Sequence, residues 1–173
     1  VYAADITNPN LNTYGTTDAA EYRFDSSDYT FEDGFSGVFI APEYTDAVPA
    51  TLHLIGEHSI RAAVAAGAVA AKLGMTAAET ASGLEKIRAV KGRMNILRGV
   101  NESVIIDDSY NSSPLAVASA LRALYQLNVP QRIVVLGSMN ELGDMSQAEH
   151  AAVGKLCDPI ALSHVVTVGE DAA

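Results

Sequence analysis

The sequence is poor in several features that define whole classes of protein. It has one cysteine, no tryptophan and only 11 basic against 21 acidic residues in 173. A single thiol excludes an internal disulfide and suits a reducing compartment, so we expect a cytoplasmic protein. The net charge of -10 disfavours nucleic acid or an anionic membrane surface as a partner. The longest uncharged run of small residues, Ala62–Ala71, is much shorter than the ~18 residues of a membrane span, so we expect no membrane insertion.

Several catalytic motifs are absent as well. The only Gly-Lys pair, Gly154-Lys155, is followed by leucine and does not belong to a G-x-x-x-x-G-K-[ST] phosphate loop. No G-x-G-x-x-G follows a strand pattern, and there is no nucleophile elbow. No cysteines and histidines have zinc-site spacing, so Cys157 is interpreted as a small packed side chain.

What is present describes a globular protein of two unlike parts. Hydrophobic residues make up 49% of the chain and charged residues 18%, a composition that can bury a core. The length fits one domain or two small ones. Residues 1–58 hold ten acidic residues and one basic residue, whereas residues 59–173 hold eleven and ten. The uneven charge indicates two segments of different character.

The first segment predicts short antiparallel strands followed by two helices. Alternating stretches such as Glu21–Phe24 and a run at Ala50–Ile55 are typical of strands. An alanine-rich pattern predicts a helix over His58–Leu73 that ends at Gly74 in a left-handed conformation. The Thr76–Glu79 stretch is a capping box, which predicts a second helix reaching about Val90. We expect a domain boundary at Gly92, which divides the chain into residues 1–91 and 92–173.

The second segment predicts a parallel α/β arrangement. Continuous apolar runs at Ser103–Asp107, Arg132–Leu136 and His164–Val168 are typical of buried parallel strands. Helices are expected between them, over Leu115–Leu127 and from a second capping box at Ser146–Glu149. Right-handed crossovers would make the three strands parallel, with their carboxyl ends along one edge, where ligands bind in such sheets.

Three places carry candidate binding residues, and the first of them lies at this edge. Asp107 and Asp108 stand between a strand and a helix, where they could hold a ribose hydroxyl, a cation-bridged phosphate or an amine. The acids and serines of this segment could equally well only cap the helix. Arg93, beside the flexible Gly92, could grip a phosphate at a hinge, or be a solvated surface charge. His58, at a strand-to-helix turn, could face a nucleotide or simply pack.

In chain order, the motifs resemble those of the Mur ligase family. The words that carry the resemblance are Gly56-Glu57-His58-Ser59, Gly92-Arg93-Met94, Asp107-Asp108-Ser109-Tyr110-Asn111 with Pro114, Val135-Leu136-Gly137-Ser138-Met139-Asn140-Glu141-Leu142-Gly143, and His150 with Val153-Gly154. The D-D-S-Y-N and V-L-G-x-M-x-E-L-G segments resemble the MurF branch of the family. The resemblance is strong over about residues 50–173 and weak before them.

The resemblance implies a fragment of a three-domain cytoplasmic enzyme. Residues 1–91 would be the later part of the central ATPase domain, with short strands plus two helices, and residues 92–173 the start of a Rossmann-like C-terminal domain. Such a ligase uses ATP and Mg to join D-alanyl-D-alanine to UDP-N-acetylmuramoyl-tripeptide through an acyl phosphate, in cell-wall precursor synthesis. The family's phosphate loop and metal ligands have no counterpart here, so we expect no catalytic residue and no metal ligand in the chain, and no activity from it alone.

The resemblance also implies roles for individual residues. His58, Ser59, Arg93 and Asp108 correspond to positions that contact the nucleotide. Ser59 and Ala62 replace asparagines that help to hold adenine in the family, and Ser138 stands where aspartate is usual. The substrate-facing positions are Asp107, Ser109, Tyr110 and Asn111.

Two alternatives remain open at this stage. The chain could belong to another amide ligase of the family, such as a different Mur ligase or a folylpolyglutamate or cyanophycin synthetase. It could also be a non-catalytic module that binds a nucleotide or a partner, which the replacements Ser59 and Ala62 favour.

Overall fold

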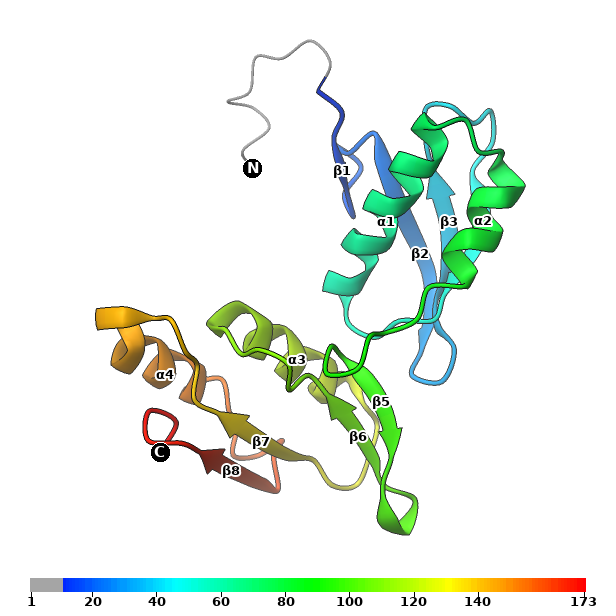
Figure 1. Ribbon diagram of the computed structural model, residues 1–173. Helices are drawn as coiled ribbons and strands as arrows, with labels where there is room; N and C mark the ends of the chain where they lie inside the picture. The colour runs from blue at the N-terminus through cyan, green and yellow to red at the C-terminus, as the bar shows by residue number, and fades with distance from the viewer. Residues whose placement is uncertain (1–10) are drawn as a thin grey trace. The chain divides into compact units, whose positions relative to one another are not determined.

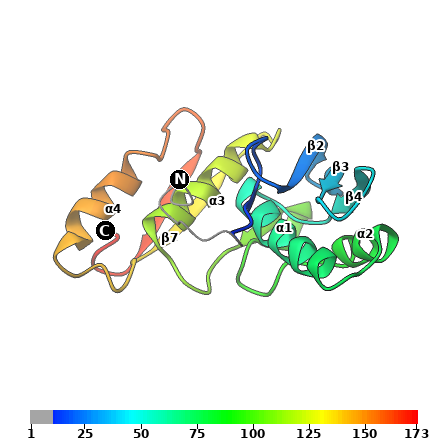
Figure 2. The same cartoon turned by 90° about the horizontal axis from the view of Figure 1, so that it is seen from above.

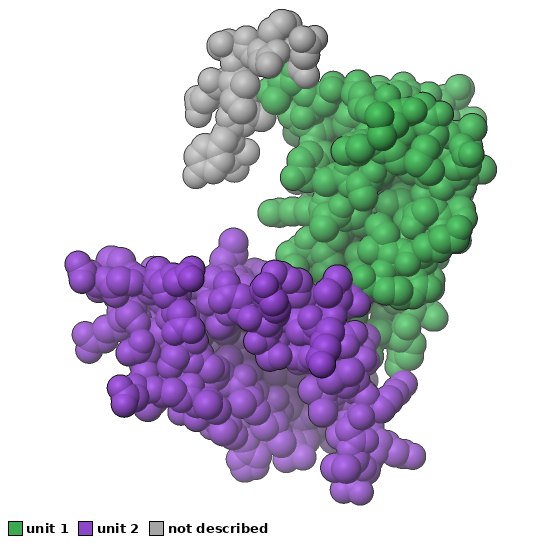
Figure 3. All heavy atoms as spheres, in the orientation of Figure 1, with its two compact units in different colours: residues 1–88 green, residues 89–173 purple. Residues whose placement is uncertain are grey.

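The computed structural model describes residues 11–173, which divide into two compact units (Figure 3). Unit 1 extends to Arg88 and unit 2 begins at Ala89. The division falls just before Gly92, the residue at which we predict the domain boundary. Within the described part, no helix combines the length and apolar character needed to cross a membrane.

Unit 1 is built on a four-stranded sheet, which confirms the predicted strands. The strands are β1 (Tyr14–Gly15), β2 (Tyr22–Thr30), β3 (Gly34–Ile40) and β4 (Val48–Leu52), and they lie in the order β1-β2-β3-β4. β3 pairs in antiparallel orientation with both β2 and β4, whereas the short β1 runs parallel to β2. Gly34 closes the β2–β3 turn at a φ of 86°, a conformation that glycine adopts without steric strain.

Two helices, α1 (Glu57–Lys72) and α2 (Ala77–Glu85), cover one face of this sheet (Figures 1 and 2). The first helix and the left-handed Gly74 beyond it, with φ 83°, confirm the prediction. The capping box is confirmed too, because the Thr76 hydroxyl accepts from the Glu79 N–H at 3.3 Å and the Glu79 carboxylate from the Thr76 N–H at 2.9 Å.

The predicted end of the second helix near Val90 is wrong, because α2 ends at Glu85. The Ile87 N–H donates to the Leu84 carbonyl, which tightens the last turn. The Arg88 guanidinium then donates to the carbonyls of Glu85 and Ile87, the latter at 2.9 Å. These bonds satisfy carbonyls that a longer helix would otherwise have used.

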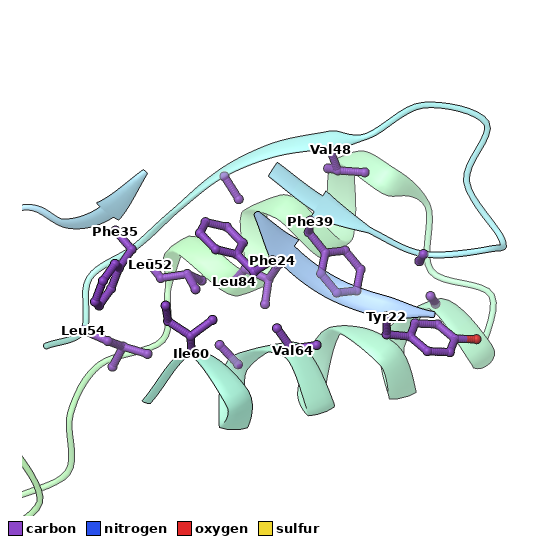
Figure 4. Packing of buried hydrophobic residues seen from close by; sticks show 14 residues of the cluster. Tyr22, Phe24, Phe35, Phe39, Val48, Leu52, Leu54, Ile60, Val64 and Leu84 are labelled. Atoms are coloured by element: carbon purple, nitrogen blue, oxygen red, sulfur yellow. The ribbon is translucent and has the colours of Figure 1, made fainter. Parts of the chain in front are cut away.

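The core of unit 1 lies between the sheet and the two helices (Figure 4). Phe39 and Leu52 of the sheet are fully buried, and Val64 of α1 and Leu84 of α2 pack into the same cluster. Thr80 is the one buried polar side chain of the described residues, and its hydroxyl shares a 2.6 Å hydrogen bond with the Tyr44 hydroxyl. The core is therefore apolar apart from one satisfied hydroxyl pair.

We expect Thr76→Ala to destabilise unit 1 by ~1 kcal/mol, the usual effect of losing an N-cap side chain. The Glu79 N–H would lose its acceptor, and the Glu79 carboxylate would lose the Thr76 hydroxyl, which donates to it at 2.7 Å. Thr76→Ser retains both bonds and serves as the control. Hydrogen exchange of the first-turn amides of α2 measures the effect, and equal protection in the two variants would contradict it.

The capping box also gives unit 1 a pH dependence. Hydrogen bonds from the Thr76 hydroxyl and amide hold the pKa of Glu79 below its ordinary value. A carboxyl whose folded pKa is depressed stabilises the fold above its unfolded pKa, and this contribution is lost as pH falls through the folded pKa. We expect Glu79→Gln to reduce the acid sensitivity of α2, measured as the change in amide protection of the helix between neutral and acidic pH.

Unit 2 contains the predicted alternation of strands and helices, together with one additional strand. Its elements are β5 (Asn95–Arg98), the 3-10 turn η2 (Val100–Glu102), β6 (Val104–Asp107), α3 (Pro114–Gln126), β7 (Ile133–Gly137), the 3-10 turn η3 (Gly143–Met145), α4 (Ser146–Gly154) and β8 (His164–Val168). The strands β6, β7 and β8 run in the same direction in Figure 1, so their carboxyl ends face the same side. The mixed α/β class is confirmed.

The single three-stranded parallel sheet is not formed in the described residues. β7 pairs with β8 in parallel as predicted, but β6 pairs with β5 in antiparallel orientation, and no ladder joins β6 to β7. The prediction omitted β5, which turns back on β6 through Gly99 and the left-handed Asn101 and Glu102. A local hairpin of this kind requires less chain ordering than a distant parallel pairing.

The prediction of buried strands in unit 2 is also wrong. β8 is exposed along its whole length, and Val135 of β7 is 64% exposed. Figure 1 shows α3 and α4 on the same side of these strands. An apolar run predicts burial only if protein covers both faces of the strand, and the described residues do not provide that cover.

The capping box predicted at Ser146–Glu149 does not form. Met145 is the N-cap residue of α4, and no side chain caps the helix. The 3-10 turn η3 leads directly into α4, so Ser146 already has helical backbone angles. The same four-residue pattern that caps α2 therefore lies inside the helix here, because a preceding turn begins the helix earlier.

Candidate functional site

The carboxyl end of β6 and the segment that precedes β5 form one structural cluster in unit 2. The cluster comprises the Gly92–Met94 segment and the Asp107–Asn111 loop. The helix α3 that follows is capped by Ser113, whose hydroxyl accepts from the Ala116 N–H at 3.3 Å. The capping interpretation of the sequence is thus confirmed for a serine of this segment, whereas the two aspartates bond elsewhere and do not cap α3.

Asp107, the last residue of β6, is an ionised carboxylate held by its own loop. Its Oδ1 accepts from the Ser109 hydroxyl at 2.6 Å and from the Ser109 N–H at 3.2 Å. These bonds, together with the Gly92 backbone and the charge of Lys91, hold the pKa of Asp107 below its ordinary value despite some desolvation. Ser109 therefore orients and stabilises the charge of Asp107.

Asp108 connects the loop to the segment before β5. Its Oδ1 accepts from the Met94 N–H at 3.0 Å, and Met94 is 3% exposed with a positive φ of 50°. Two residues away, the Tyr110 N–H donates to the Gly92 carbonyl at 3.0 Å. Both neighbours of Arg93 are therefore bonded to the loop.

We expect Asp108→Ala to remove the hydrogen bond between the loop and the segment before β5, since the Met94 N–H would be left without its acceptor. An unsatisfied amide in a buried position costs about 1–3 kcal/mol. Asp108→Asn keeps an oxygen at the same place and is the matched control. Amide exchange of Met94, followed by NMR, should accelerate strongly in Asp108→Ala and little in Asp108→Asn; unchanged exchange in the alanine variant would contradict the assignment.

Arg93 lies over the ring of Tyr110. Its guanidinium carbon is 4.4 Å from the ring centroid, well within cation-π range. Both side chains are exposed, Tyr110 to 70%. Among the described residues Arg93 forms no ion pair, and Asn111 stands exposed next to this stack.

The other two predicted residues, His58 and Ser59, lie in unit 1 at the start of α1. His58 is exposed in the first turn. The Ser59 hydroxyl donates to the Ile55 carbonyl at 2.9 Å, so this side chain stabilises the strand-to-helix turn. Unit 2 thus gathers six of the eight predicted residues, Arg93, Asp107, Asp108, Ser109, Tyr110 and Asn111.

The loop after β7 contains an arrangement that the sequence did not predict. The Met139 N–H donates to His150 Nε2 at 2.8 Å, and His150 Nδ1 lies 2.8 Å from the Ser146 carbonyl oxygen. His150 therefore fixes this loop to the start of α4. The buried Ser138 hydroxyl has no partner in the described residues, although the Ser138 N–H donates to the Val168 carbonyl at 3.0 Å.

The described residues contain no ready-made metal centre, because no three His, Cys, Asp or Glu side chains converge in residues 11–173. Asp107 and Asp108 are adjacent, and each has one oxygen engaged within the protein. We therefore assign no metal ligand among the described residues.

Comparison with known proteins points to one family. The family described as "Mur ligase, glutamate ligase domain" matches residues 92–173. The chain is 32% identical over 126 residues to the UDP-N-acetylmuramoyl-tripeptide--D-alanyl-D-alanine ligase of Escherichia coli K12, covering 73% of this chain and 28% of that protein. The corresponding ligase of Haemophilus influenzae is 30% identical over 156 residues, with 87% and 34% covered. The chain therefore spans about a third or less of the length of these curated relatives.

Solved structures give the same result. A crystal structure of MurF from Acinetobacter baumannii matches with a TM-score of 0.80 and 29% identity, over 92% of this chain and 34% of that one. The MurF ligase of Thermotoga maritima in complex with ADP shares the fold, with a TM-score of 0.75 and 24% identity over 92% of this chain and 36% of that one.

Proposed function

The chain belongs to the Mur ligase family, and from this premise we propose that it is part of a MurF-type ligase that joins D-alanyl-D-alanine to UDP-N-acetylmuramoyl-tripeptide. One structural observation carries this proposal: both neighbours of Arg93 form hydrogen bonds with the Asp108–Tyr110 loop. This places a cation and two carboxylates at one strand end, as a site for a nucleotide and an amine requires.

We propose the following roles for the residues of this site. Arg93 binds phosphate oxygens through its guanidinium, and Asp108 accepts from a ribose hydroxyl through the oxygen that Met94 does not occupy. Asp107, ionised and held by Ser109, attracts the ammonium group of the incoming dipeptide. Tyr110 and Asn111 border the same place, and His58 and Ser59 of unit 1 are proposed nucleotide contacts.

The chemistry requires activation of a carboxylate, because a carboxylate is a poor electrophile until one oxygen becomes part of a good leaving group. ATP, when bound, supplies the phosphoryl group for this activation. The described residues supply binding and orientation only, and we assign them no metal-dependent step. We propose that the activity belongs to the complete enzyme in the cytoplasm, and we expect the 173-residue chain alone to show no ATP turnover.

The division of the chain supports a matching domain proposal. We propose that residues 1–91 belong to the central ATP-binding domain and residues 92–173 begin the C-terminal Rossmann-like domain. The exposed apolar strand β8 supports this, since a strand with exposed valines on both faces needs further protein to cover it.

The decisive experiment incubates the complete enzyme with ATP, UDP-N-acetylmuramoyl-tripeptide and D-alanyl-D-alanine, and follows dipeptide consumption and ADP release. We expect both to depend on all three substrates. L-alanine with UDP-N-acetylmuramate is the control for another branch of the Mur ligase family. The UDP-N-acetylmuramate--L-alanine ligase of Ruegeria pomeroyi is 29% identical to this chain over 169 residues. Turnover with that pair alone would contradict the assignment.

A non-catalytic module is the second candidate, because the Ser59 hydroxyl is engaged by the Ile55 carbonyl and Ala62 has no polar group. This candidate predicts that the folded complete protein binds ADP but consumes neither D-alanyl-D-alanine nor L-alanine. The same experiment therefore separates the two functions.

A further inference from the structure

We propose that Tyr110 is a positioning residue that holds the Arg93 guanidinium by its flat face and so presents the N–H edge of Arg93 to a phosphate group. This inference rests on the proposed function for the identity of the phosphate, which we take to be that of a nucleotide. It changes the expected role of Tyr110, because the ring would act through Arg93 rather than by touching the substrate.

Arg93 contacts an aromatic ring, whereas Arg23 and Arg132 contact the protein through their N–H groups. Arg23 is paired with Asp25 at 3.1 Å, and Arg132 donates to the carbonyls of Leu124 and Leu127. Each of these guanidiniums uses N–H groups to contact the protein. Arg93, in contrast, contacts the Tyr110 ring at 4.4 Å and makes no ion pair with a described residue.

A contact through the face leaves the donors of a guanidinium available. The five N–H groups of arginine lie in the plane of the group. A guanidinium that lies parallel on an aromatic ring is attracted through its face, and its N–H edge stays clear of the ring. A carboxylate partner would instead occupy the N–H edge and compete with a ligand. In this parallel orientation on Tyr110, Arg93 would be held in place and would keep two parallel N–H bonds free for a phosphate.

The backbone fixes the stack from both sides. The Gly92 carbonyl accepts from the Tyr110 N–H at 3.0 Å, and the Met94 N–H donates to Asp108 at 3.0 Å. A methyl group on Gly92 would lie 3.1 Å from the Tyr110 Cβ, so the two segments are in close contact. Arg93 stands between two bonded neighbours, and less conformational freedom remains to be lost when a ligand binds.

The experiment compares four variants of the complete enzyme by calorimetric titration with ADP. We expect Tyr110→Phe to bind within twofold of the wild type, because the ring is kept. Tyr110→Leu should weaken binding about three- to fivefold, the effect of an exposed cation-π contact. Arg93→Ala should weaken binding more, and Arg93→Ala with Tyr110→Leu should bind no worse than Arg93→Ala alone. Tyr14→Leu, at an exposed tyrosine of unit 1, is the control.

Three results would overturn the proposal. Equal weakening by Tyr110→Leu with and without Arg93 would mean that the ring touches the nucleotide itself. A loss in Tyr110→Phe as large as in Tyr110→Leu would assign the effect to the hydroxyl. An unchanged affinity in Tyr110→Leu would mean that the stack orients nothing.

A second readout separates this proposal from the proposed function. Pyrophosphate is titrated while the Arg93 Nε–H resonance is followed by NMR. We expect its shift to respond in the wild type and in Tyr110→Phe, and at three- to fivefold higher concentration in Tyr110→Leu. A protein that ignores ADP but gives this pattern would refute the nucleotide ligase and retain the positioning role, whereas the same pyrophosphate response in all three proteins would refute the positioning role.

Discussion

Replacing Gly34 with alanine should destabilise unit 1 by about 3 kcal/mol, because two unfavourable effects coincide there. Gly34 has a φ of 86°, a region in which a side chain is strained. An added methyl group would also overlap the Leu52 carbonyl oxygen and approach the Leu54 N atom at 2.9 Å. Both neighbours are backbone atoms of β4 and the residues after it, which cannot move without breaking the sheet.

Gly74→Ala is the matched control for this substitution. Gly74 has nearly the same backbone angle, φ 83°, but a methyl group there would meet no atom within 4 Å. We expect it to cost about 1–2 kcal/mol, the strain of the left-handed conformation alone. Native-state hydrogen exchange of the β3 and β4 amides measures both variants within unit 1 and avoids assuming that the two units unfold together. Equal losses in the two variants would show that the close contact at Gly34 contributes nothing.

Local signals in the sequence predicted local structure well in unit 1. Thr76 and Glu79 specify the start of α2 because the two residues bond to each other's backbone, a geometry contained within four residues. Ser146 and Glu149 have the same spacing, but the turn η3 ahead of them has already begun the helix. A local pattern thus predicts structure only where its flanking residues leave it undisturbed.

Strand pairing and burial were harder to predict. β5 is only four residues long, and it pairs with β6 in a hairpin. No alternation of apolar and polar residues in the sequence predicts this hairpin. The apolar run at His164–Val168 correctly predicted a strand, β8. Whether that strand is buried depends on which other elements cover it, and β8 is exposed. Strand identity is encoded in neighbouring residues, whereas burial depends on elements far along the chain, and even a short hairpin pairing is not visible in the alternation of residues.

The candidate site shows the same division. The residues themselves could be named from their motif, because acids at a strand end and an arginine after a glycine have a recognisable chemistry. The bond from the Met94 N–H to Asp108 joins residues fourteen positions apart and follows from the register of β5 on β6. That register, and the stacking of Arg93 on Tyr110, became visible only in the folded chain.

Gly67 supplies the other large expected effect, because α1 packs closely against the sheet at this residue. A methyl group on Gly67 would lie 2.8 Å from the Phe39 Cζ atom, and Phe39 is fully buried. Since the ring has no space to move into, we expect Gly67→Val to destabilise unit 1 by about 2–3 kcal/mol through overpacking. Exchange protection of the α1 and β3 amides measures this loss.

A second glycine and a second substitution test whether the contact with the Phe39 ring causes this loss of stability. Gly83 lies in α2 with no atom within 4 Å of an added methyl group, so Gly83→Ala should stabilise its helix by about 0.5–1 kcal/mol through propensity alone. Phe39→Leu removes the ring atoms that approach Gly67. If the ring is the obstacle, Gly67→Val should cost clearly less in the Phe39→Leu background than in the wild type, because the two changes share one space. Additive losses would instead place the obstacle elsewhere on the sheet.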